Sequence, residues 1–78
     1  MKPVYPEVAR KARAEGKVIL EIVVDRTGDV EAVKVLRSNP LFDQAAIEAV
    51  KMWKYQPAFQ GGRPVRVYLT VVVEFSLR

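Results

Sequence analysis

The residues with the most suggestive spacing for chemistry are two carboxylates, Asp25 and Asp29, which stand on either side of Gly28. Two carboxylates held close together can share a metal ion or act as an acid–base pair. Short Asp side chains beside a glycine are also typical of turns, because they accept hydrogen bonds from nearby amides while the glycine adopts positive φ. We interpret residues 25–29 as a turn, with the metal or acid–base site as the alternative.

The composition argues against catalysis. The chain of 78 residues contains no cysteine and no histidine. It therefore lacks disulfides, thiolate metal ligands and the most common nucleophile and proton shuttle. The pair Gly61-Gly62 precedes an expected strand rather than a helix, which does not fit a phosphate-binding loop. We expect no enzymatic activity, no cofactor and no metal site.

The basic residues suggest a second kind of site. The formal net charge is +4, a sign that attracts acidic peptides, nucleic acid or anionic headgroups. Arg10, Lys11, Arg13 and Lys17 lie close together in the sequence. Neither a GXXG clamp nor an aromatic RNA-binding pattern accompanies them. We interpret them as a solvated helix face and expect no nucleic-acid partner; a small basic nucleic-acid-binding domain is the alternative and would require strongly salt-dependent binding.

The first half of the chain predicts one short helix and a hairpin. Pro6 suits the first position of a helix, and Gly16 is a natural stop. Residues 17–25 are rich in β-branched side chains and place an entirely apolar set on one face, which predicts a central strand. Residues 30–37 follow the turn as the second strand of the hairpin.

The second half predicts a helix and one long strand. Residues 41–55 have helical periodicity, with Trp53 expected at the far end of the apolar face, and Pro57 ends the helix. A turn is expected at residues 60–64. Residues 65–77 then alternate between apolar and polar side chains, broken only by Val72, which predicts a strand with one buried face.

These elements predict a single α+β domain over residues 1–78. Half of the residues are hydrophobic, which suffices for one core. The element order is helix, strand, strand, helix, strand (α-β-β-α-β). A right-handed crossover gives a three-stranded antiparallel sheet of order 2-1-3, with two helices packed on one face. The last strand is then an edge of the sheet.

This edge strand is the main candidate for a binding site. Its middle, residues 68–73, contains no proline, glycine or lysine to blunt it. The edge is either covered by the N-terminal segment or by another copy in a homodimer, or it receives an extended peptide as an added strand. On the outer face, Tyr68, Thr70 and Val72 are either a contact surface or ordinary cross-strand neighbours, and both interpretations stay open.

A set of motifs resembles a known family. The chain resembles, from about Pro3 to Leu77, the C-terminal domain of TonB-family energy transducers. It departs from the best-known members at Lys2 and Val4, where those members carry glutamines. The matching motifs are Tyr5-Pro6, Glu15-Gly16-Lys17-Val18, Val24-Asp25, Gly28-Asp29-Val30, Asp43-Gln44-Ala45-Ala46, Trp53-Lys54-Tyr55-Gln56-Pro57-Ala58, Gly62-Arg63-Pro64-Val65 and Phe75-Ser76-Leu77.

The resemblance implies a periplasmic domain that is a fragment of a longer protein. In such proteins an N-terminal transmembrane helix and a proline-rich stalk tether the domain to the inner membrane and to a proton-motive-force-driven motor complex. The domain captures the TonB box, a short peptide of outer-membrane TonB-dependent transporters, which adds as a strand beside the last strand. The segment before the first helix also touches the transporter. The implied partner-binding residues are Pro3, Val4, Tyr5, Pro6, Val67, Tyr68, Leu69, Thr70, Val71, Val72, Val73 and Glu74.

Overall fold

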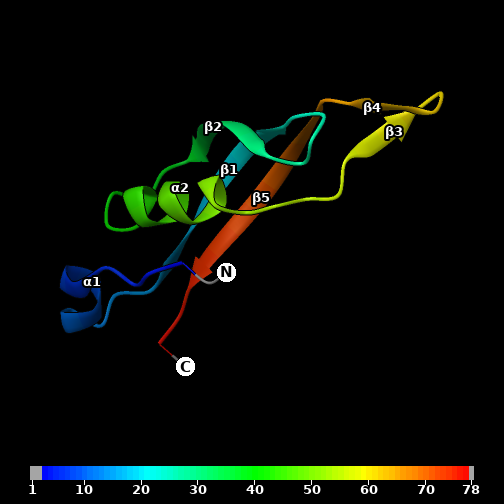
Figure 1. Cartoon of the computed structure of the whole chain (residues 1–78). Coiled ribbons are helices and arrows are strands. Elements are labelled where there is room, and N and C mark those ends of the chain that lie inside the picture. The colour runs from blue at the N-terminus through cyan, green and yellow to red at the C-terminus, as the bar shows by residue number, and fades with distance from the viewer. Residues whose placement is uncertain (1–2, 78) are drawn as a thin grey trace.

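The computed structural model describes residues 3–77 (Figure 1); Met1, Lys2 and Arg78 lie outside this description. Residues 3–77 form two helices and five strands. Their bounds are α1 Glu7–Lys11, β1 Gly16–Val24, β2 Val30–Arg37, α2 Asp43–Lys51, β3 Ala58–Gln60, β4 Arg63–Val65 and β5 Val67–Phe75.

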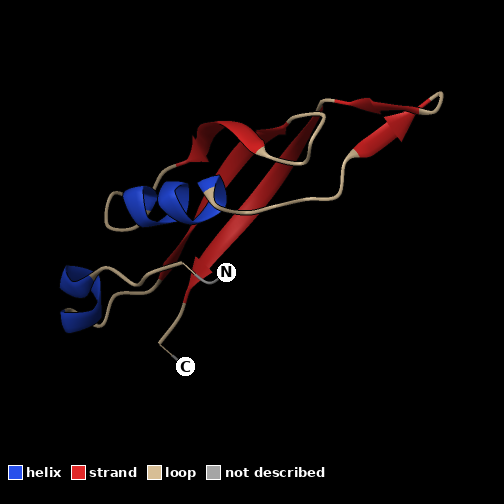
Figure 2. Cartoon of the chain, viewed as in Figure 1, coloured by secondary structure: helices blue, strands red, loops and turns tan. Residues whose placement is uncertain are grey.

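The three longest strands form an antiparallel sheet in the order β2-β1-β5. This confirms the predicted order 2-1-3, with the most apolar strand in the centre. Within residues 3–77 the two short strands, β3 and β4, pair only with each other, and they form a hairpin that extends beyond the end of the sheet (Figure 2). The predicted α+β class and strand order are therefore confirmed. The sequence pattern did not predict the β3–β4 hairpin.

The core lies on one face of the sheet. Alternate residues of β1 are completely or almost completely buried, as the apolar face of residues 17–25 predicts. Helix α2 packs across this face, mainly against β2 and β1. Helix α1 lies at one end of the sheet (Figure 1) and contributes Ala9 to the same core. Phe42, directly before α2, stacks on Phe75 at a ring-centroid distance of 4.4 Å and so joins the helix to the end of β5.

Helix α1 is shorter than predicted. It ends at Lys11 with Ala12 as its C-cap, and Arg13 takes a left-handed conformation with φ 55°. The expected stop, Gly16, is instead the first residue of β1. Pro6 is the N-cap rather than the first helical residue. Residues 12–15 then connect the helix to the start of β1.

Helix α2 also ends before the predicted boundary. It stops at Lys51, so Trp53 and Tyr55 follow the helix instead of belonging to it. The amide of Tyr55 donates a hydrogen bond to the carbonyl of Gly28 at 2.9 Å, and the backbone of Lys54 forms an isolated antiparallel β-bridge with that of Asp29. Tertiary pairing with the β1–β2 turn therefore takes these residues out of the helix. No helix within residues 3–77 has the length and hydrophobicity needed to cross a bilayer.

The predicted strand over residues 65–77 is divided in two. Residues 63–65 belong to β4, Arg66 interrupts the pairing, and β5 ends at Phe75. The alternation of apolar and polar side chains continues through Arg66. Strand β1, however, ends at Val24, which pairs with Val67, so the pairing with β1 does not extend to Arg66. The change of partner therefore ends the strand at a point that periodicity does not reveal. Leu77 is correspondingly exposed.

Candidate functional site at the edge of strand β5

Strand β5 has one paired side and one unpaired side. It pairs with β1 in an unbroken antiparallel register from Val67 opposite Val24 to Phe75 opposite Gly16. Within residues 3–77 no strand pairs with its other side, and residues 3–15 contribute no strand to the sheet. The prediction that the last strand is an edge is confirmed. Its outward backbone groups are available to another extended chain.

The turn after β1 shows which backbone groups face outward. Asp25 donates its amide to the carbonyl of Asp29 at 2.8 Å and accepts from the amide of Gly28 at 3.1 Å, so its backbone faces β2. Backbone direction alternates along a strand, so Val24 faces β5. Because Val24 pairs with Val67, the backbone N–H and C=O groups of Val67 and of every second residue after it point toward β1. The residues whose N–H and C=O groups point outward are Tyr68, Thr70, Val72 and Glu74.

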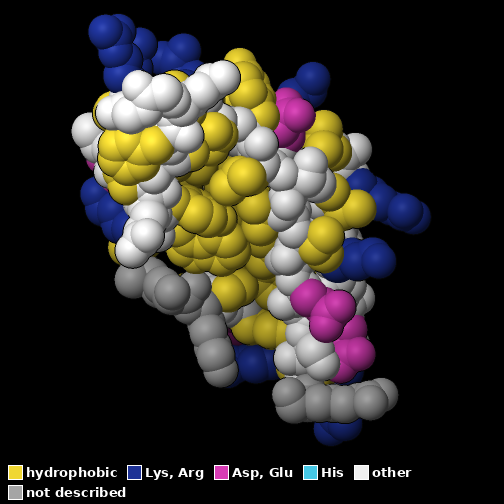
Figure 3. All heavy atoms as spheres, turned by 90° about the vertical axis from the view of Figure 1, so that its right-hand side faces the viewer, with side chains coloured by type: hydrophobic (Ala, Val, Ile, Leu, Met, Phe, Trp, Pro, Cys, Tyr) yellow, Lys and Arg dark blue, Asp and Glu magenta, His cyan; other side chains and the backbone are white. Residues whose placement is uncertain are grey.

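The two faces of β5 differ in how deeply their side chains are buried. The residues with outward backbone groups also carry exposed side chains, and Tyr68 and Val72 lie opposite Val23 and Ile19 as cross-strand neighbours. On the core face, Val73 and Phe75 are buried, but Val67, Leu69 and Val71 are only half-buried. Since α2 lies mainly over β2 and β1, the apolar face of β5 is left partly open. Figure 3 shows a continuous hydrophobic area on the side of the molecule that lies to the right in Figure 1.

The N-terminal segment reaches the same strand at its Phe75 end. The ring of Tyr5 packs edge-on against Phe42 and Phe75, and its hydroxyl donates to the carbonyl of Ala14. Desolvation raises the pKa of the Tyr5 hydroxyl, and the Glu15 carboxylate adds to this rise. Pro3 and Pro6 are half-buried, whereas the side chain of Val4 is 80% exposed. Of the four predicted contact residues in this segment, Val4 offers the most surface. The predicted departure at Lys2 lies outside the described residues.

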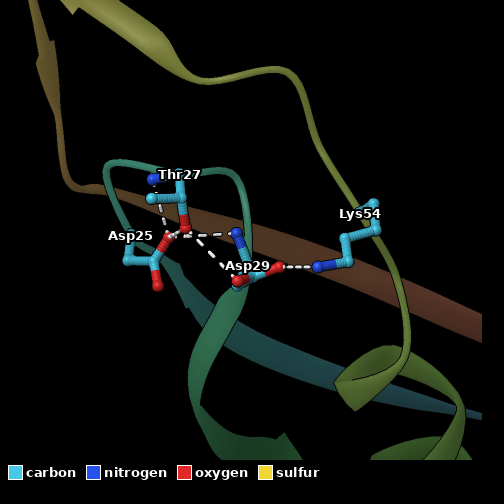
Figure 4. A network of polar contacts seen from close by, with 4 residues as sticks. All are labelled: Asp25, Thr27, Asp29 and Lys54. Carbon is cyan, nitrogen blue, oxygen red and sulfur yellow. Dashed lines mark hydrogen bonds and ion pairs between the residues drawn. The ribbon is translucent and has the colours of Figure 1, made fainter.

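The carboxylates of the β1–β2 turn form a structural network (Figure 4). One oxygen of Asp25 accepts hydrogen bonds from the hydroxyl of Thr27 at 2.7 Å, the amide of Thr27 at 2.8 Å and the amide of Asp29 at 3.0 Å. The Thr27 hydroxyl and then its amide lower the pKa of Asp25. Asp29 pairs with Lys54, and this hydrogen bond raises the pKa of Lys54. The interpretation of residues 25–29 as a turn is confirmed, and no group of three potential metal ligands occurs in residues 3–77.

The predicted basic face lies at the other end of the molecule. Arg10, Lys11, Arg13 and Lys17 are all exposed, and Lys11 pairs with Glu7 within α1 at 3.6 Å. Sequence reasoning missed the role of a different cation, Lys54, because its partner Asp29 lies 25 residues away along the chain. Lys54 ties the segment after α2 to the turn of the sheet.

Comparison with known proteins identifies the family. Residues 1–77 match the model described as the Gram-negative bacterial TonB protein C-terminal. The chain is 37% identical to the TonB protein of Vibrio cholerae, over 99% of this chain and 32% of that protein. It is 34% identical to the protein tonB2 of Pseudomonas aeruginosa, over 96% of this chain and 28% of that protein. The chain thus spans about a third of the length of these curated relatives.

Solved structures agree with the sequence comparison. The solution structure of the Pseudomonas aeruginosa TonB C-terminal domain superimposes with a TM-score of 0.83 at 29% identity, over 99% of this chain and 80% of that one. The TonB2 protein of Vibrio anguillarum gives a TM-score of 0.72 at 36% identity, over 99% and 76% of the two chains. By sequence and by fold, the chain belongs to the family of C-terminal domains of Gram-negative bacterial TonB proteins.

Proposed function

We propose that this domain binds an extended peptide along the free edge of β5 and acts as the peptide-binding domain of a TonB-like energy transducer. The peptide is the TonB box of an outer-membrane TonB-dependent transporter, and the domain transmits a proton-motive-force-driven pull to it. One observation carries the proposal: the outward backbone groups of Tyr68, Thr70, Val72 and Glu74 lack a partner strand within residues 3–77. Backbone pairing of this kind requires no catalytic residue.

The expected affinity suits a cyclic contact. About five added backbone hydrogen bonds, each contributing roughly 0.5–1.5 kcal/mol net, give a gross gain of roughly 3–7 kcal/mol. Apolar side chains of the peptide gain further by covering the half-buried Val67, Leu69 and Val71. Ordering and association subtract several kcal/mol. A dissociation constant near micromolar is therefore the expected upper limit of affinity, which permits repeated capture and release.

The parts of the mechanism outside this chain belong to the same proposal. The relatives are about three times as long as the matched region. We expect the remainder of the protein to supply an inner-membrane anchor, a stalk and the contact with the motor complex, which places the domain in the periplasm. The exposed Val4, next in sequence to Tyr5, whose ring packs on Phe75, supplies a second contact with the transporter.

A pair of proline substitutions tests peptide binding. Proline removes one backbone donor, and its effect depends on which side of the strand that donor faces. Thr70→Pro removes an outward donor and should abolish peptide binding while the fold persists. Its neighbour Val71→Pro removes a bond to β1 and should unfold the domain. Circular dichroism reports the fold, and calorimetric titration with a TonB box peptide reports binding.

Two results would contradict the proposal. One is unchanged peptide affinity in a folded Thr70→Pro variant, and the other is the absence of any peptide binding by the unmodified chain. A homodimer that uses the same edge is the second candidate, because a self-complementary strand edge can pair with a second copy. Sedimentation equilibrium separates the two: a concentration-dependent dimer that excludes the peptide favours self-association.

A further inference from the structure

A second feature lies at the far end of the molecule, at the base of the β3–β4 hairpin. An open cavity of about 410 Å³ is lined by Arg26, Gln60, Pro64, Val65 and two further arginines, Arg63 and Arg66. Arg26 comes from the β1–β2 turn, whereas the other residues come from the hairpin, apart from Arg66, which links the hairpin to β5. The fold therefore brings three arginines from two separate segments to the lining of one cavity.

The carboxylates near this cavity already have partners. Glu31 accepts from Arg66 at 3.0 Å, Asp29 pairs with Lys54, and Asp25 accepts the hydrogen bonds of the turn. None of the three lines the cavity. Among residues 3–77, neither Arg26 nor Arg63 forms an ion pair. Positive charges that share a cavity repel each other, so a bound anion would stabilise this arrangement.

The chemistry of the lining fits an oxyanion such as a phosphate group. A guanidinium presents its donors in a planar fork that matches two oxygens of a phosphate. Arg26 and Arg63, which form no ion pair within residues 3–77, line the cavity together with Gln60. A carboxyl or phosphoryl group in free solution would satisfy these donors equally well. A second property of the hairpin separates a free anion from a headgroup at a surface.

The second property of the hairpin is its exposed apolar face. Phe59 lies directly opposite Pro64 in the β3–β4 register, so both side chains project from the same face of the hairpin. Gln60 and Arg63 form the next pair and project from the other face. Phe59 is 66% exposed. The hairpin thus combines an exposed aromatic side with a basic side, as segments that lie in a membrane interface do.

We propose that the β3–β4 hairpin binds the surface of an anionic phospholipid membrane, with Phe59 in the interface and a lipid phosphate in the cavity of Arg26, Arg63 and Arg66. This contact lies at the end of the molecule opposite α1 (Figure 1) and is separate from peptide pairing at β5. It would hold the hairpin end of the sheet against a bilayer surface.

Vesicle flotation with the complete chain tests the proposal. The vesicles contain phosphatidylcholine alone or phosphatidylcholine with an equal amount of phosphatidylglycerol. We expect binding to the anionic vesicles only. The double variant Arg26→Gln/Arg63→Gln should weaken it roughly thirtyfold, from about 1 kcal/mol per basic residue at an anionic surface. Phe59→Ser should weaken it about tenfold through lost apolar burial.

Matched variants at the opposite end control for net charge and exposed apolar area. Arg10→Gln/Lys17→Gln removes the same charge, and Val8→Ser removes an exposed apolar side chain of α1. The molecule is 49 Å long, several times the screening length of about 10 Å in 0.1 M salt. These variants should therefore bind anionic vesicles within about threefold of the unmodified chain.

The outcomes distinguish the possible ligands. Anionic-vesicle binding that is lost in the Arg26/Arg63 double variant, and retained in the controls, supports the proposal. Inorganic phosphate that shifts the side-chain NMR signals of Arg26 and Arg63, without vesicle binding, overturns it in favour of a free anion. Absence of both kinds of binding, or equal losses in both double variants, also overturns it. The Thr70→Pro variant should bind vesicles normally, so this test does not depend on peptide binding.

Discussion

At the scale of single residues, Gly28 fixes the contact between the β1–β2 turn and the segment after α2. Its φ is +91°, and a Cβ atom there would lie 1.9 Å from the carbonyl oxygen of Tyr55. Gly28→Ala therefore combines backbone strain with a backbone clash and should lower the free energy of unfolding by about 2–4 kcal/mol. Denaturant unfolding measures the loss.

Gly61 provides the matched control for this substitution. It also has positive φ, at +58°, but no heavy atom lies within 4 Å of the position of an added Cβ. Gly61→Ala should therefore show the strain without the clash and lower the free energy of unfolding by only about 1 kcal/mol. Equal losses in the two variants would show that the contact between Gly28 and Tyr55 does not stabilise the domain.

Asp25 gives the turn a pH dependence. Hydrogen bonds from Thr27 and Asp29 lower its pKa in the folded state, so the ionised carboxylate stabilises the fold above the unfolded pKa. This contribution is lost as the pH falls through the folded pKa. Asp25→Asn should be less stable than the unmodified chain at neutral pH, and the difference should disappear in acid. Unfolding at a series of pH values measures it.

The control for this effect is Thr27→Val, which removes the hydroxyl that contributes most to the lowered pKa of Asp25. When Thr27→Val is already present, adding Asp25→Asn should lower the free energy of unfolding at neutral pH by less than it does in the unmodified chain. A stability difference between the unmodified chain and Asp25→Asn that persists unchanged into strong acid would assign the effect to packing instead of ionisation.

At the scale of elements, β5 should show alternating amide exchange. The amides of Leu69 and Val71 face β1 in the antiparallel register, whereas those of Thr70 and Val72 face away from it. In the free domain the first pair should exchange slowly and the second pair quickly, because only the first pair is hydrogen-bonded. Hydrogen exchange measured by NMR reports each amide separately.

A bound peptide should change this pattern in one way. Thr70 and Val72 should become protected, while the protection of Leu69 and Val71 changes little beyond the general gain in stability. Protection that spreads evenly over the strand would contradict pairing at the edge. Protection of Arg26 and Arg63 alone would place the peptide at the basic cavity instead.

The elements also show what can be predicted from sequence. The alternation in residues 17–25 predicts the central strand and its buried face, because a two-residue period follows directly from strand geometry. The predicted ends of α2 and of the last strand are wrong for a shared reason. Tyr55 leaves the helix to pair with Gly28, and Val67 is the last residue that β1 can pair. Both boundaries are set by partners distant in sequence, which local periodicity does not contain.

The candidate site, too, can be predicted from the sequence only in part. The absence of proline, glycine and lysine in residues 68–73 marks the edge strand from sequence alone. The direction of its amides follows only from the hydrogen bonds of Asp25, at the far end of the neighbouring strand. The cavity of Arg26 and Arg63 has no sequence signal, because 37 positions separate two arginines that only the fold brings together.

At the scale of the whole molecule, the long sheet places two surfaces at different positions along a 49 Å axis. The edge of β5 runs beside the core, whereas the hairpin extends past it (Figure 2). A peptide at the edge and a membrane at the hairpin would therefore not compete for the same residues. A second copy of the chain at the edge would compete with the peptide directly.

This competition gives a prediction that separates peptide capture from self-association. A ligand that binds only the folded state raises the free energy of unfolding by about 2.7 kcal/mol when its free concentration is a hundred times its dissociation constant. If β5 binds peptide as a monomer, the TonB box peptide should raise the unfolding midpoint by the same amount at every protein concentration. If two copies pair through β5, the midpoint should rise with protein concentration without peptide, and the peptide should add less at high concentration because it first displaces the partner. Thr70→Pro should remove either effect, so a midpoint shift that survives this substitution would place the stabilising contact away from the outward amides of β5.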